Sequence, residues 1–464
     1  MAFTERFINT YKKLIPSPFT IALLLTFITV IIALIFTKPN KISTGAYFME
    51  IAGYWEKGLW NKSDGGIYFA FQMMFMLVFG HIIALSTPVY NLINKLLKPC
   101  TNTANTVFIV TFSTILVSYL NWGLGLIFGA ILARQIGEKF NREKRPLNYS
   151  MIGAAAYVGL MVWHGGLSGS APIKAAESGN LKNLVENVNG IDLTQIPERL
   201  DLSETLFSNL NIFITISLLI CLPGIMYLIG KRTKPTSNLP SKIISPPSDN
   251  ATHTGLEKLD QIQFFNKLIG ALFIGYAIYK AFILPDEINL KFINPNFINF
   301  CLFGGAILLH DNIKQFTEAA GEAIKDATGI LLQFPLYFGI LGIMIHTGLI
   351  NLITDSFVAI ASESTLPLFN FISAALVNIF VPSGGGQWVV QGPILVSAAQ
   401  ELGVGYGKSI MAMAYGEQLT NMIQPFWALP LLGITGLKAK EILPYTMILF
   451  GAGLFIFTFG LLLF

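Results

Sequence analysis

Four segments rich in glycine and polar residues interrupt otherwise apolar stretches, and they hold most of the side chains that could do chemistry. They cover residues 118–125, 163–172, 382–388 and 415–425. Backbone that is not helical at membrane depth is tolerated only where it lines a cavity or binds something. One such break would be a weak signal, since glycine also permits close helix packing. Four breaks at corresponding places predict a ligand site.

The chemistry of these segments favours a small anion held without a fixed positive charge. None of the four contains Lys or Arg. Exposed N–H groups and the positive end of a half-helix dipole favour an anion instead. Ser383, the amides of 384–386, and Asn121 with Gly123 are suitable donors for a small carboxylate. Local capping of a hairpin tip is the alternative role for Ser383 and Asn121, and it is compatible with binding.

Two titratable residues lie in these segments. Glu417 is the one acidic residue within a predicted broken crossing, and an ionisable group at that depth is functional by default. It would accept a coupling proton or help to hold a cation, whereas the alternative is a structural pairing with a neighbouring donor. His164 could titrate near physiological pH, and a neutral, hydrogen-bonded histidine is the alternative.

The composition indicates that lipid is the solvent of this chain. Its residues are 53% hydrophobic and only 12% charged, with a mean hydropathy of +0.60, whereas soluble domains carry about a quarter charged residues. The net charge of +4 is small for 464 residues, and nucleic acid is not expected as a partner. Three scattered cysteines without a CxxC pair indicate neither a disulfide framework nor a metal site. We predict crossings near 17–36, 67–85, 149–172, 206–230, 264–284, 297–309, 329–350, 408–434 and 443–464.

The distribution of basic residues predicts the topology. With the N-terminus inside, 20 of the 30 Lys and Arg residues fall on the cytoplasmic side, as the positive-inside rule requires. This layout holds only if the split apolar stretches 105–133 and 366–400 return to the side from which they enter. We therefore interpret them as re-entrant hairpins. Two amphipathic stretches, 44–60 and 310–328, separate the equivalent pairs of crossings.

The fold predicted from this pattern is an all-α polytopic membrane protein with an inverted structural repeat. Each half has a re-entrant helical hairpin and an unwound transmembrane helix. The first repeat covers 1–230, with hairpin 105–133 and broken helix 149–172, and 231–262 has the composition of a cytoplasmic linker. The rest, 263–464, holds a bridging helix at 264–284 and the second repeat, with hairpin 366–400 and broken helix 408–434. Residues 1–15 suit a helix lying on the membrane surface, or a solvated leader.

Several of these segments resemble a known family. The run 381–393 (VPSGGGQWVVQGP) resembles the signature of the bacterial short-chain fatty acid transporter (AtoE) family, and 119–125, 163–172 and 416–427 are similar to it as well. The resemblance implies uptake of short-chain monocarboxylates such as acetoacetate and butyrate across the cytoplasmic membrane. It also implies kinship with an ion-transporter superfamily of elevator-type carriers, usually dimers with a moving transport domain.

The leading hypothesis is therefore a multi-pass carrier of the bacterial inner membrane, a secondary active transporter that works as a homodimer. A unit formed by 105–172 and 366–425 would move and hold the carboxylate between the hairpin tips. No ATP-binding motif and no enzyme chemistry are found, and no cofactor is expected apart from Na⁺ or H⁺ as the coupling ion. A passive small-anion channel and a membrane-embedded acyl-processing enzyme are the alternatives.

The candidate residues fall into two sets. The substrate-binding set is Asn121, Trp122, Gly123, Gly125, His164, Gly165, Gly166, Ser168, Ser383, Gly384, Gly385, Gly386, Gln387, Gln418 and Asn421. The ion-coupling set is Asn121, Glu417 and Thr420, and the candidate metal site is a Na⁺ near Asn121 and Thr420. Trp122, Trp388 and Trp427 would wall the cavity or sit at the membrane interface, and for Trp427 we expect the interface.

Overall fold

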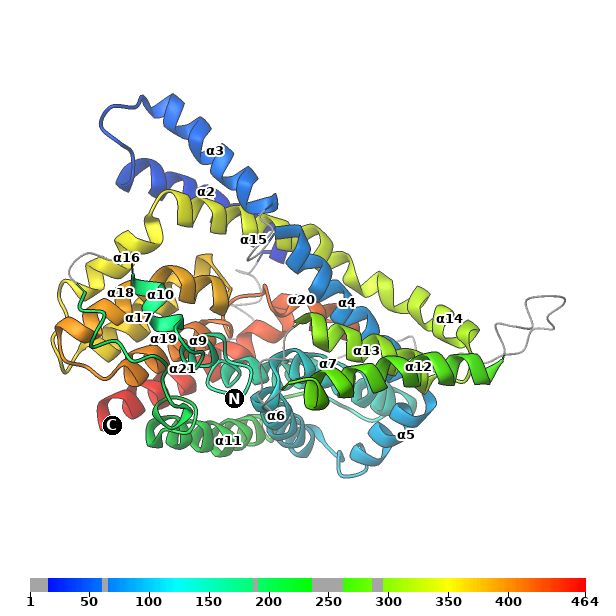
Figure 1. Ribbon diagram of the computed structural model, residues 1–464. Coiled ribbons are helices and arrows are strands. Elements are labelled where there is room, and N and C mark those ends of the chain that lie inside the picture. The colour runs from blue at the N-terminus through cyan, green and yellow to red at the C-terminus, as the bar shows by residue number, and fades with distance from the viewer. Residues whose placement is uncertain (1–15, 61–65, 187–190, 236–261, 286–294) are drawn as a thin grey trace.

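The computed structural model describes residues 16–60, 66–186, 191–235, 262–285 and 295–464, and every regular element in these ranges is a helix (Figure 1). The all-α class is confirmed. Among these residues, five helices are long and apolar enough to cross a membrane, and the number is six if one bent pair counts as a single span. The surface helix expected at 1–15 and most of the linker lie outside the described residues.

One set of helices, here called the peripheral group, packs around α15. It contains α2 (Pro18–Phe36), α3 (Thr44–Trp60), α4 (Gly66–Leu85), α12 (Gln263–Ile278), α13 (Pro295–Leu309), α14 (Ile313–Ala323) and α15 (Thr328–His346). Helix α15 contacts α2, α3 and α4, while α13 joins α4 to α12. Apolar side chains such as Phe27, Ile35 and Phe36 are more than 60% exposed on α2, as expected for a lipid-facing surface.

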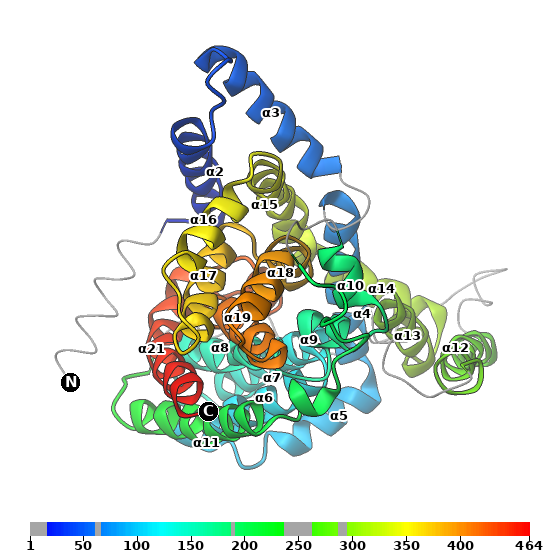
Figure 2. The same ribbon diagram turned by 60° about the vertical axis from the view of Figure 1, so that its left-hand side comes forward.

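A second set, the central group, holds both hairpins and both broken helices (Figure 2). It contains α6 (Thr103–Leu120), α7 (Trp122–Arg142), α8 (Tyr149–Tyr157), α9 (Ser170–Ala175), α10 (Asn180–Val185), α11 (Asn209–Gly230), α16 (Leu349–Val358), α17 (Leu366–Phe380), α18 (Gly384–Glu401), α19 (Tyr406–Thr420), α20 (Leu429–Thr435) and α21 (Ala439–Leu463). Contacts of α4 with α7 and of α15 with α20 connect it to the peripheral group, and short α5 (Thr87–Leu96) follows α4 and also touches α7.

The two hairpins, α6–α7 and α17–α18, point at each other from opposite ends of the central group. Helix α11 runs from one of these ends to the other. It finishes with Gly230 against Ala104, at the start of α6, and begins close to Glu204, which lies against Gly407 at the start of α19. Its 22 residues span about 33 Å at 1.5 Å per residue. Both tips approach the break at 163–166, since Tyr119 lies against Gly166 and Gly384 lies against the rings of Trp163 and His164.

The breaks lie where the sequence placed them, but they are shorter than predicted. Only Asn121 separates α6 from α7, and α19 remains helical through Glu417 as far as Thr420. Gly416 lies within α19 at a close approach to α17, where a Cβ would overlap the carbonyl oxygen of Phe371. Its role is close helix packing, so the predicted break at 415–420 is wrong and the chain unwinds only from Asn421.

The first hairpin also differs from its predicted bounds of 105–133. Its second arm continues to Arg142, and Arg134, expected in a cytoplasmic loop, lies within α7 with its side chain 13% exposed. The Arg134 Nε donates to Glu138 Oε1 at 2.7 Å, one turn further along α7. Such i,i+4 pairs stabilise a helix, which explains why the arm does not end before its first charge.

A further difference concerns the predicted crossing 329–350. Helix α15 ends at His346, and α16 follows after a bend of 61°. Gly348 sits at this bend with φ +75°, a left-handed conformation that glycine adopts without steric cost. The bend brings α16 onto α17 and α18, so the peripheral group is joined directly to the second hairpin.

Candidate functional site

The two broken helices meet through the side chain of Gln418. Its Oε1 accepts hydrogen bonds from the backbone N–H groups of His164 and Gly165, each at 3.1 Å. These two amides lie between the short helical turn that ends at Met161 and α9, so the helical ladder gives them no partner. A buried N–H without a partner is costly. Gln418, from the second half, therefore supplies the hydrogen-bond acceptor that the unwound backbone of the first half needs.

The imidazole of His164 lies between two partners that fix its protonation. The Ala171 N–H donates to Nε2 at 3.1 Å, and Nδ1 lies 3.1 Å from Oε2 of Glu417. Since a backbone N–H can only donate, Nε2 must carry a lone pair and Nδ1 the proton. His164 is thus neutral and donates to the Glu417 carboxylate. The hydrogen bonds of the alternative roles of His164 and Glu417 are thus both present, and the coupling role of Glu417 stays a prediction.

Glu417 is fully buried, and only one of its two oxygens is paired. Among the described residues Oε1 has no hydrogen-bond partner. The backbone at this point is held by Asn378 of α17, whose Nδ2 donates to the Glu417 carbonyl at 2.9 Å and to Thr420 Oγ1 and Asn421 Oδ1 at 3.0 Å. The arrangement leaves a carboxylate in the protein interior with unused capacity to bind a proton or a cation.

The tip of the first hairpin is attached to the first broken helix. Asn121 Oδ1 accepts from the Leu124 N–H at 3.0 Å and so caps α7. The Trp122 N–H donates to Ser168 Oγ at 3.0 Å, and the Leu167 N–H donates to the Tyr119 carbonyl at 2.8 Å. Gly166 packs against the backbone of that same tyrosine. These contacts hold the tip and the break together.

The tip of the second hairpin touches the same break by packing alone. Ser383 Oγ accepts from the Gly386 N–H at 3.2 Å and caps α18. At Gly384 a Cβ would lie 2.8 Å from the His164 ring and 2.8 Å from the Trp163 ring, whereas at Gly385 the nearest atom would be 3.9 Å away, on Ser170. Local capping is therefore observed for Ser383 as it is for Asn121.

Aromatic rings close one side of the meeting point. Trp163 stacks on His164 with centroids 4.5 Å apart, and Trp122 lies edge-on to Trp163 at 6.0 Å and to Trp427 at 5.0 Å. Trp427 is only 5% exposed, so its expected place at the membrane interface is wrong. Trp388 is also buried, but it lies elsewhere, with Nε1 3.4 Å from Asn180 Oδ1.

Some of the predicted residues lie away from this meeting point. Gln387 turns into its own hairpin, where Nε2 donates to the Ala374 carbonyl and to Gln391 Oε1. Gly123 packs against Met76 and Gly125 against Ser118. The printed contacts of Thr420 and Asn421 run to Asn378, Gly416, Glu417 and Tyr157, not to Asn121. A Na⁺ near Asn121 and Thr420 stays a prediction.

The sequence analysis missed a layer of polar residues that supports the breaks. Asn211 Nδ2 donates to the Gly165 carbonyl at 2.8 Å, and the Tyr415 hydroxyl donates to Asn211 Oδ1 at 3.1 Å. The Tyr157 hydroxyl donates to the Asn421 carbonyl at 2.9 Å. An amide inside an otherwise apolar helix, as at Asn211 and Asn378, is the signal that could have found them, because lipid offers such a group no partner.

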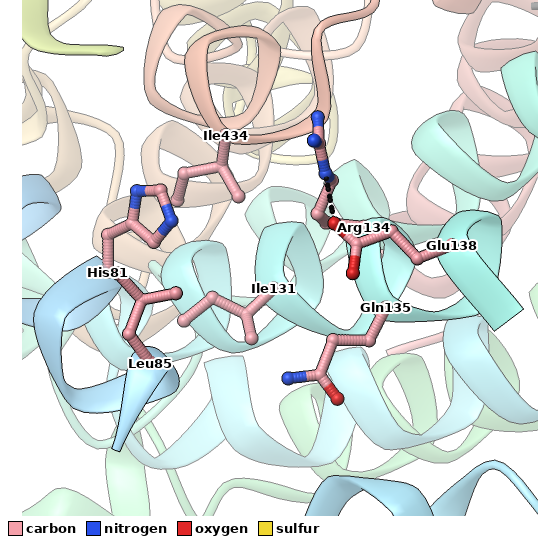
Figure 3. Close-up of a pocket in the computed structure, with 7 residues that line it drawn as sticks. All are labelled: His81, Leu85, Ile131, Arg134, Gln135, Glu138 and Ile434. Atoms are coloured by element: carbon pink, nitrogen blue, oxygen red, sulfur yellow. Dashed lines mark hydrogen bonds and ion pairs between the residues drawn. The ribbon is translucent and has the colours of Figure 1, made fainter. Parts of the chain in front are cut away.

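A small cavity of about 20 Å³ lies between α4, α7 and α20 (Figure 3). His81 of α4 faces Ile131 and Ile434 on one side of it, and the Arg134–Glu138 pair lies on the other. The Gln135 amide points toward the space between them, and its Oε1 has no partner among the described residues. The volume suffices for one water molecule, which is too small for an organic substrate.

Two solved structures match this chain at low similarity. The YdaH transporter of Alcanivorax borkumensis is 14% identical with a TM-score of 0.43, and the match covers 97% of both chains. The MtrF protein of Neisseria gonorrhoeae, described as one of a class of antimetabolite efflux pumps, is 15% identical with a TM-score of 0.44, and the match covers 98% of this chain and 96% of that one.

Sequence comparison gives a much stronger result. The Haemophilus influenzae protein named "Putative short-chain fatty acid transporter" is 38% identical, with 97% of this chain and 98% of the relative covered. The protein of the same name from Escherichia coli K12 is 37% identical, with 100% of this chain and 98% of the relative covered. The family model described as short chain fatty acid transporter matches residues 2–464. The chain belongs to the short-chain fatty acid transporter family, which is a family of transporters and not of enzymes.

Proposed function

We propose that this protein is a secondary active transporter that carries short-chain monocarboxylates, such as butyrate or acetoacetate, across the cytoplasmic membrane together with a cation. Membership of the family supports the substrate class. The observation that supports coupling to a cation is the fully buried Glu417. One of its carboxylate oxygens contacts His164, and the other has no partner among the described residues. The N-terminus would lie inside the cell.

Charge balance gives the physical reason for a coupled cation. Glu417 is negative and its partner His164 is neutral in the observed geometry. A monocarboxylate would bring a second negative charge to a site whose four segments contain no Lys or Arg. Two uncompensated charges inside a membrane protein are very costly. A proton on Glu417, or a Na⁺ beside its free oxygen, would remove one of them.

The substrate carboxylate would bind between the two hairpin tips. Both α7, with 21 residues, and α18, with 18 residues, begin at a tip with a polar N-cap, so the positive ends of both helices face the middle of the molecule. The amides of Gly384 and Gly385 remain at the start of α18 to donate to an anion. The faces of Trp122 and Trp163 would cover the short alkyl chain.

Transport would proceed by movement of the central group against the peripheral group, in the manner of an elevator, and within a homodimer. Three observations support this. The open ends of the two hairpins lie near opposite ends of α11, which an inverted repeat would require, and the two broken helices share the hydrogen bonds of Gln418. The first tip is tied to Ser168, so both breaks and this tip would move as one body.

Counterflow in proteoliposomes tests the proposed function. Vesicles loaded with unlabelled butyrate should take up labelled butyrate transiently above its external concentration, and the initial rate should saturate. Flux that stays linear with concentration and shows no exchange would support a passive channel for small anions instead. Competition of unlabelled formate, butyrate and octanoate with labelled butyrate defines the substrate class, since only the short-chain compounds should compete.

A further inference from the structure

A cavity of about 470 Å³ lies on the boundary between the central and peripheral groups, away from the hairpin tips. The start of α2 at Pro18 and the start of α15 at Gly329 line it from the peripheral group. From the central group it is lined by Leu429 and Leu432 of α20 and by the start of α21 at Ala439. Its volume suits a small organic group, in contrast to the water-sized cavity beside His81.

Three lysines from two parts of the chain line this cavity. They are Lys325, Lys438 and Lys440. Lys325 lies 3.4 Å from Glu322, while Lys438 and Lys440 have no acidic partner within salt-bridge distance among the described residues. Glu441, three residues after Lys438, is turned to the backbone, where its Oε2 accepts the Lys438 N–H at 2.7 Å. Two of the three ammonium groups are thus available to an anion.

The helices that begin at the cavity fix its depth relative to the lipid. Helix α2 begins at Pro18 and α21 at Ala439, and both are among the candidate membrane spans. A spanning helix begins where the hydrocarbon begins, so the cavity lies at the level of the lipid headgroups. The starts of α2 and α21 also place the positive ends of two helix dipoles beside it.

We propose that this cavity binds the headgroup of an anionic phospholipid. The charge of Lys438 and Lys440 matches the phosphodiester, and the apolar side chains of Leu429 and Leu432 suit the first part of the acyl chains. A basic pocket between membrane helices is a recognised kind of lipid site. A soluble anion would gain nothing from these leucines, and for that reason the lipid is the favoured occupant. The bound lipid would bridge the peripheral and central groups.

The experiment is native mass spectrometry of the full chain in detergent with phosphatidylglycerol or phosphatidylcholine of equal chain length. We expect the wild type to retain phosphatidylglycerol preferentially. Lys438→Gln with Lys440→Gln should reduce that retention roughly 25-fold, since each lysine near a headgroup contributes about fivefold. The protein with Lys438→Arg and Lys440→Arg keeps both positive charges and should retain the lipid. It is the control that a loss of lipid in the Gln variant comes from the lost charge and not from misfolding. Lys182→Gln, on an exposed lysine paired with Glu198 near the opposite end, is the matched control.

Three results would overturn the proposal. Equal retention of the two lipids, or no loss in the double Gln variant, means that the lysines do not select an anionic headgroup. Displacement of the lipid by excess inorganic phosphate identifies a site for free anions. Increased lipid retention after deletion of residues 1–15 means that this segment, which joins the chain at the cavity, occupies it in the full protein.

Discussion

His164 of the first half and Glu417 of the second half, 253 positions apart, lie with Nδ1 and Oε2 at 3.1 Å in the protein interior. The Ala171 N–H on the other ring nitrogen makes His164 a donor toward the carboxylate. The pair links the two broken helices and leaves one carboxylate oxygen without a partner among the described residues. A cation bound at that oxygen, as we propose, would act on both breaks through this pair.

His164→Ala should abolish transport and lower stability. It removes the partner of a buried carboxylate and of the Ala171 N–H, and breaking a buried pair in this way costs about 3–5 kcal/mol. The melting temperature in detergent and butyrate uptake are the two measurements. His346→Ala, on an exposed histidine of α15, is the control. A stable, fully active His164→Ala protein would show that the pair has no role.

Two neighbouring glycines at the second tip should respond differently to alanine. In Gly384→Ala the Cβ would lie 2.8 Å from the His164 and Trp163 rings, whereas in Gly385→Ala the nearest atom is 3.9 Å away. The first variant should push the tip away from the break and reduce the rate of butyrate exchange at least about tenfold, a barrier change of ~1.4 kcal/mol. The second should stay close to wild type. Equal rates in the two variants would contradict the observed approach of the tip.

Removal of the two caps should weaken substrate binding. Asn121→Ala and Ser383→Ala each delete the side chain that caps a tip helix, which costs about 1 kcal/mol and disturbs the amides proposed to bind the carboxylate. Saturable uptake should show a raised KM with unchanged protein levels. Asn102→Ala, which removes the equivalent cap of α6 at the far end of the hairpin, should leave the KM unaffected. If all three variants behave alike, the tips do not bind the substrate.

Gly416→Ala tests the packing of α19 on α17. A Cβ at this position would overlap the carbonyl oxygen of Phe371, and overpacking of this kind costs about 1–3 kcal/mol. We expect a lower melting temperature and reduced uptake. Gly451→Ala on α21, where nothing lies within 4 Å of the added carbon, should melt like the wild type. An unchanged melting temperature for Gly416→Ala would mean that the helices can separate without cost.

The sequence predicted the elements well where composition alone determines them. The amphipathic stretch 44–60 coincides with α3, and Asn121 and Ser383 sit where polar residues interrupt apolar runs, at the two helix starts. The family was also correctly identified from its glycine-rich motifs. Such features are local, so the residues that cause them are adjacent in the chain.

Features that depend on distant contacts could not be predicted. Gly416 was read as a break, although its neighbour Phe371 on α17 makes it a packing glycine. The distribution of basic residues predicts Arg134 in a cytoplasmic loop, whereas it lies within α7 and pairs with Glu138. The pairing of His164 with Glu417 needs two segments 253 positions apart to meet, and only the tertiary fold brings them together.

The most direct test of the account is accumulation of labelled butyrate in proteoliposomes under an imposed inward gradient of Na⁺ or of protons. Wild type should accumulate butyrate above its equilibrium level with one of these gradients. Glu417→Gln should exchange butyrate but not accumulate it, because the neutral amide can still accept from His164 yet needs no cation. Glu198→Gln, on an exposed loop, should behave as wild type. Two results would contradict the account. One is that Glu417→Gln accumulates butyrate under the gradient to the wild-type level. The other is that the wild type brings butyrate only to its equilibrium level under both gradients.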